Sequence, residues 1–186
     1  MRLLPAACLV AALTAVAVPA QASAAPVHVA NARGTFAAYA PGAHAITYRP
    51  DLVPAGARAR VFSVSAEHAG TTTALVVTGL LPGHAYGAHA HAQACGATGD
   101  AAGPHFQDVP DPVKPSVDPA YANPRNEIWL DFTTDRLGTG TALSTVDWTF
   151  GERRAHSVVV HETHTHTDPG HAGTAGARLA CLDVAF

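Results

Sequence analysis

Histidine is the residue type in this sequence with the clearest chemical potential. The chain carries twelve histidines among its 186 residues. His89 and His91 lie two positions apart, so on a β-strand both imidazoles would face the same side and could reach one metal ion. His105 follows in a Gly-Pro-rich segment, and His161 ends a run of three valines. Imidazole binds transition metals and carries protons near neutral pH, so these positions predict a metal site, with scattered surface histidines as the alternative.

The segments around these histidines have the pattern of short β-strands separated by Gly/Pro breaks. We expect strands at 44–49, 57–67, 71–81, 86–92, 127–133, 140–148, 157–162 and 178–186. Eight such segments without an amphipathic helical stretch are typical of an all-β sandwich or barrel. Residues 95–125 carry six prolines and no regular pattern, which predicts a long loop. One domain is therefore expected over 44–186, preceded by a flexible lead-in over 25–43.

Residues 1–24 have the features of a secretory signal peptide. A positive start and an apolar stretch precede small residues, which predicts cleavage after Ala24, with Ala22 as the second choice. A lipid-anchored Cys8 is the alternative. Cleavage would leave Cys95 and Cys181 in a secreted or extracytoplasmic chain, where an even pair predicts a disulfide, with two buried free thiols as the alternative. No other segment is apolar enough to span a membrane.

The charge content excludes one large class of function. Charged residues make up only 13 % of the chain, the formal net charge is −3, and Lys114 is the single lysine. A nucleic-acid-binding protein needs a basic patch to neutralise phosphates. No nucleic-acid partner is therefore expected.

Four motifs together resemble the copper/zinc superoxide dismutase family. The family's copper pair G-x-H-x-H is similar to G-A-H-A-H here, its bridging-histidine loop to G-P-H-F, a further ligand strand to V-V-V-H-E, and its C-terminal motif to G-A-R-L-A-C. The resemblance implies a Greek-key β-sandwich holding one copper per chain, with superoxide as the substrate. It assigns the ligands His89, His91, His105 and His161, a proton-carrying role to His105, superoxide guidance to Arg178, and the disulfide partner Cys181.

The sequence departs from the family at the second metal. No histidine lies between His105 and His156, so the family's further zinc-binding histidines are missing. The sequence is therefore identified as a copper-only form, in which zinc is absent. The distal nitrogen of His105 then needs another partner to fix its orientation. Glu127 is the candidate, with a surface glutamate as the alternative interpretation. Asp131 is the other nearby carboxylate, and we expect it to face solvent.

The segment between His161 and Arg178 contains no lysine or arginine but three further histidines, His164, His166 and His171. These could form a polar surface loop, an auxiliary metal or copper-acquisition site, or a pH-dependent guide for the anion. A copper storage or delivery protein without turnover is the competing function. The arginine at 178 favours the enzyme, because a storage protein needs no anion guide.

Overall fold

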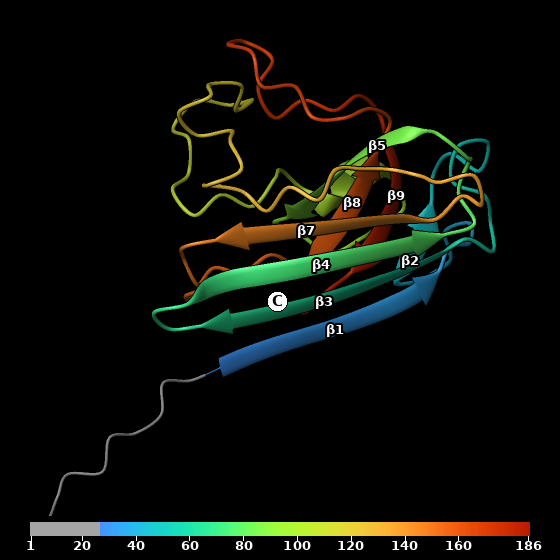
Figure 1. Cartoon of the computed structure of the whole chain (residues 1–186), viewed down its shortest axis with the longest axis horizontal. Helices are drawn as coiled ribbons and strands as arrows, with labels where there is room; N and C mark the ends of the chain where they lie inside the picture. The colour runs from blue at the N-terminus through green and yellow to red at the C-terminus, as the bar shows by residue number, and fades with distance from the viewer. Residues whose placement is uncertain (1–26) are drawn as a thin grey trace, which may run out of the picture.

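The computed structural model describes residues 27–186, whose regular elements are nearly all β-strands (Figure 1). The predicted signal peptide lies outside the described residues. The elements are β1 (Val27–Thr35), β2 (Ala45–Thr47), β3 (Arg58–Ala66), β4 (Gly70–Thr78), β5 (Ala85–His91), a 3-10 helix η1 (Gly99–Ala102), β6 (Phe132–Thr133), β7 (Gly140–Val146), β8 (Ser157–His161) and β9 (Arg178–Asp183).

Two antiparallel sheets form the domain. One has the strand order β1-β3-β4-β7, and the other has the order β2-β9-β8-β5-β6. Figure 1 shows the first sheet in front of β5, β8 and β9. The predicted all-β sandwich is confirmed. The alternative of a closed barrel is wrong, because the two sheets are open and each keeps free edges.

The core lies between the two sheets and follows the alternation of side chains along the strands. In β3 every second residue is buried, and Val61 and Leu75 on β3 and β4 face the other sheet with at most 1 % exposure. Val158 and Val160 meet them from β8. The five-stranded sheet is buried on its outer face too, since Val159 packs against Ala102 there.

The segment predicted as a flexible lead-in contains a strand. β1 pairs with β3 over its full length, from Val27 opposite Ala66 to Thr35 opposite Arg58. Only Ala30 in β1 is buried, so the apolar alternation that signals a strand is missing. An edge strand of this kind is held by its backbone ladder, which leaves little trace in the sequence.

The long loop after β5 is fastened to the C-terminal strand. Cys95 and Cys181 form a disulfide across 86 residues of sequence, as predicted. The Cys95 N–H also donates to Oδ1 of Asp183 at 2.6 Å. Within residues 27–186, no helix is long and apolar enough to cross a membrane.

Candidate metal centre

Strands β5 and β8 place three histidines on the outer face of the five-stranded sheet. Ala88 and Ala90 face the core, so His89 and His91 project to the other side, where both are fully buried. His161 on β8 pairs with Gly87 on β5. Gly87 is two positions before His89, so His161 projects from the same face of the sheet as His89. A Cβ atom at Gly87 would come within 2.8 Å of the Ala175 side chain, so glycine permits this close packing.

The long loop brings His105 to the same place by pairing with the free edge of β5. His105 bridges to His91, and Trp129, from the far end of the loop, bridges to His89. Backbone hydrogen bonds from Phe106 and Leu130 to β5 carbonyls secure the two ends at 2.9 and 2.7 Å. Residues separated by more than twenty positions therefore lie side by side.

The four predicted ligands converge. One ring nitrogen from each of His89, His91, His105 and His161 lies within 4.8 Å of the others. Nε2 of His91 and Nε2 of His161 are 3.2 Å apart. Nitrogen ligands about 2 Å from one ion lie about 3–4 Å from one another, so this spacing suits a single metal ion.

Hydrogen bonds fix which nitrogen of His89 is free. The Thr165 hydroxyl donates to Oδ1 of Asp131 at 2.7 Å, and therefore accepts from Nε2 of His89 at 2.6 Å. Asp131 also accepts the Thr165 backbone N–H at 2.7 Å, so the threonine is held at two points. Nδ1 of His89 is left as the ligating atom. The expectation that Asp131 faces solvent is wrong: its side chain is 25 % exposed and lies 3.8 Å from Nε2 of His89.

Two more histidines are oriented through Nδ1, which leaves Nε2 for a metal. Nδ1 of His91 donates to the Gly103 carbonyl at 3.0 Å. Nδ1 of His105 donates to Oε2 of Glu127 at 2.8 Å. The structure thus places Glu127 beside the distal nitrogen of His105, buried at 1 % exposure and away from the surface.

Glu127 is itself held by other donors. Trp129 Nε1 donates to its Oε2 at 2.7 Å, and Gln107 Nε2 donates to its Oε1 at 2.8 Å. With His105, three N–H groups surround this carboxylate. The Glu127 carboxylate therefore fills the position beside Nδ1 of His105, and its two oxygens already accept hydrogen bonds from His105, Trp129 and Gln107.

Burial changes the pKa of three of the histidines in this group. Burial lowers the pKa of His89 and His91 well below the usual value, and electrostatic interaction with the neighbouring imidazole of His105 lowers it further. Burial, followed by the same neighbour and Arg178, lowers the pKa of His161 to about 3. Nδ1 of His89 is buried without a hydrogen-bond partner, as expected of its ligating atom. Nδ1 of His161 is also buried without a partner, and the nitrogen of His161 that faces His91 is Nε2. Neutral, unpaired imidazole nitrogens are electron-pair donors for a metal, so the four side chains fit a transition-metal ion.

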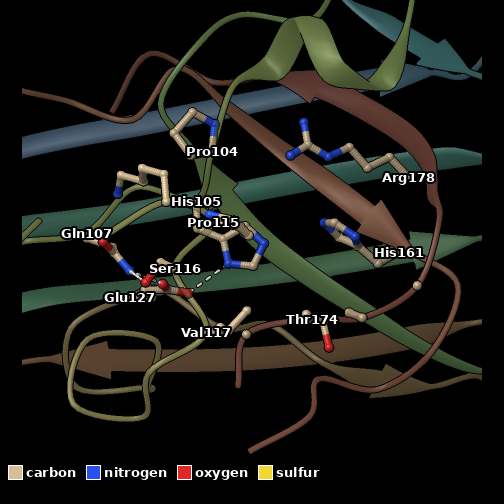
Figure 2. Close-up of a pocket in the computed structure, with 14 residues that line it drawn as sticks. Pro104, His105, Gln107, Pro115, Ser116, Val117, Glu127, His161, Thr174 and Arg178 are labelled. Carbon is tan, nitrogen blue, oxygen red and sulfur yellow. Dashed lines mark hydrogen bonds and ion pairs between the residues drawn. The ribbon is translucent and has the colours of Figure 1, made fainter. Parts of the chain in front are cut away.

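A cavity of about 710 Å³ opens onto the histidines and is lined by His105, His161, Arg178 and Lys114. Figure 2 shows Glu127 next to His105, and Arg178 beside His161 across the cavity. Arg178 donates from Nη1 to the Gly99 carbonyl at 2.9 Å, so its guanidinium is held near η1. Sequence reasoning missed Lys114 as a lining residue, although its being the sole lysine was a usable signal.

The further histidines of the 162–177 segment do not gather. Within residues 27–186, the groups of three or more potential metal ligands do not include His164, His166 or His171. All three are exposed, and Nε2 of His164 is near the Phe132 carbonyl at 3.1 Å. Thr165, between two of them, contacts His89, and no sequence signal marks it.

Comparison with known proteins supports the fold. No protein-family model and no curated protein matches the chain by sequence. Among solved structures, a single-substitution variant of an SOD-like protein from Bacillus subtilis has a TM-score of 0.52 at 15% identity, covering 67% of this chain and 88% of that chain. A double-substitution variant has a TM-score of 0.49 at 15% identity, covering 67% and 86%. The chain therefore has an SOD-like β-sandwich fold that carries a four-histidine group.

Proposed function

We propose that this protein is a copper-dependent superoxide dismutase that converts superoxide to oxygen and hydrogen peroxide. The observation that carries the proposal is the convergence of four imidazole nitrogens within 4.8 Å, beside a cavity lined by Arg178. Copper, when bound, would supply the one-electron Cu(II)/Cu(I) couple that this disproportionation needs. Imidazole ligands suit both oxidation states.

The chain's own residues would hold the metal and deliver a proton. His89 would bind through Nδ1, and His91, His105 and His161 through Nε2. His105 is suited to carry a proton on Nε2, because Glu127 holds its Nδ1 and keeps the ring in place. Arg178 would attract and orient the superoxide anion. The exposed Lys114, on the long loop, adds a positive charge at the same cavity.

A single copper without zinc is part of the proposal. A cation beside Nδ1 of His105 would meet N–H groups from Gln107 and Trp129, which repel it, and Glu127 is already shared among three donors. Export after cleavage at residue 24 is proposed as well. The disulfide supports an oxidising, extracytoplasmic location.

The test measures metal content and superoxide consumption on the same copper-loaded sample. We expect one copper per chain, no zinc and rapid dismutation. His161→Ala should reduce activity to background and weaken copper binding, whereas the matched control His156→Ala, at an exposed position, should change neither. An active, copper-loaded His161→Ala protein would refute the ligand assignment. Bound copper without turnover would instead indicate a copper storage or delivery protein, and stoichiometric zinc would contradict the copper-only form.

A further inference from the structure

A second cavity, of about 460 Å³, lies on the four-stranded sheet, where β1 and β4 end and β3 begins. Its lining includes three arginines, Arg33, Arg58 and Arg60, and no carboxylate. The sheet that bears it is the one opposite the histidine centre. The polar residues that complete the lining are Thr35, His44 and Thr78.

The strand register forces the three arginines together. Arg33 on β1 lies directly opposite Arg60 on β3, and Arg58 is two positions from Arg60 on the same face. All three are exposed, whereas Ala59 between them is buried in the core. Like charges directly opposite each other on neighbouring strands destabilise a sheet. The protein therefore keeps an unfavourable arrangement at this position.

In the part of the chain that the structure describes, no ion pair or side-chain hydrogen bond offsets this repulsion. Within residues 27–186, none of the ion pairs or side-chain hydrogen bonds involves Arg33, Arg58 or Arg60. Residues 1–26 contain no aspartate or glutamate that could supply a counter-charge. The three guanidinium groups are thus free to bind an anion from outside the chain.

We propose that these three arginines form a binding site for a phosphate group. Guanidinium presents a planar set of N–H donors that matches phosphate oxygens in pairs. Three positive charges suit a doubly charged phosphate better than a singly charged carboxylate, and the hydroxyls of Thr35 and Thr78 add donors. A free phosphate compound and the singly charged phosphodiester of an anionic lipid headgroup both present paired oxygens that guanidinium groups can bind.

The experiment compares the full chain with the double variant Arg33→Gln/Arg60→Gln. Binding of inorganic phosphate is measured by calorimetry, and binding to phosphatidylglycerol vesicles by co-sedimentation against phosphatidylcholine vesicles. The double variant should bind the anion at least about tenfold more weakly, since it loses charge-assisted hydrogen bonds. Arg136→Gln, which removes an exposed arginine elsewhere, is the matched control and should bind as the unchanged protein does.

The outcomes separate the sources of phosphate. Arginine-dependent binding of inorganic phosphate supports a soluble ligand, and arginine-dependent binding to the anionic vesicles alone supports a lipid headgroup. Binding of neither probe, or equal binding by the double variant, overturns the proposal. Without ligand, the double variant should melt at the same temperature as the unchanged protein or higher, because the repulsion is gone. A folded variant that keeps its copper content shows that the result is independent of the metal centre.

Discussion

Glu127→Gln is the substitution that tests most directly how the protein orients its central histidine. The carboxylate accepts hydrogen bonds from His105, Trp129 and Gln107 at 2.8, 2.7 and 2.8 Å. Glutamine has nearly the same size but only one acceptor oxygen, so its NH₂ group must face an N–H donor. Gln107 cannot turn to accept it freely, because its own amide oxygen already accepts the Asp111 N–H at 2.9 Å.

The expected magnitude follows from the lost interaction. At least one hydrogen bond to a charged, 1 % exposed group disappears, which costs about 1.5–3 kcal/mol of stability. Substituting the partner of a ligating histidine typically weakens metal affinity about 10–100-fold, or about 1.4–2.8 kcal/mol. We therefore expect Glu127→Gln to fold with reduced stability, to bind copper about 10–100-fold more weakly and to lose dismutase activity in a similar proportion.

Copper affinity is measured by competition with a chelator, and superoxide consumption is followed on the same samples. Glu152→Gln, which removes a carboxylate at an exposed position, is the matched control and should leave both quantities unchanged. If Glu127→Gln binds copper within about twofold of the unchanged protein, Glu127 does not orient His105 as argued.

Three further results are expected. Thr165→Val leaves Nε2–H of His89 without an acceptor and should weaken copper binding about tenfold, whereas Thr165→Ser should restore it; equal affinity for both variants would contradict the role of the hydroxyl. Replacing Cys95 and Cys181 by serine removes a cross-link over 86 residues and should lower the unfolding free energy by about 4–5 kcal/mol in denaturant titrations, and a loss well under about 1 kcal/mol would contradict this. The metal-free protein should lose stability as the pH falls below about 6.5, by up to about 1.4 kcal/mol per pH unit for each buried imidazole, because the lowered folded-state pKa means that the unfolded chain binds more protons. Denaturant midpoints at pH 7.5, 6 and 5 check the sign, and a stability that rises in acid would refute it.

Local pattern was sufficient to predict most of the strands, and the resemblance of four motifs to a known family selected the four histidines that the structure brings together. Alternating burial marks β3, β4 and β7, because a strand with one face in the core repeats its apolar residues every second position, whereas β5, β8 and β9 are short segments buried along nearly their whole length. The spacing of His89 and His91 on one face follows from the same geometry. The disulfide between Cys95 and Cys181 followed from the number of cysteines left after the predicted signal peptide.

Other features could be found only from the tertiary structure, because no repeating pattern in the sequence marks them. Strand β1 buries only Ala30 and is held by backbone pairing, so its sequence resembles a loop. Glu127 was a candidate among others until the pairing of both loop ends with β5 placed it 2.8 Å from His105. Thr165 comes close to His89 only because the segment after β8 folds back over the sheet. Such contacts depend on how distant segments pack, and sequence alternation reports only which face of a strand is buried.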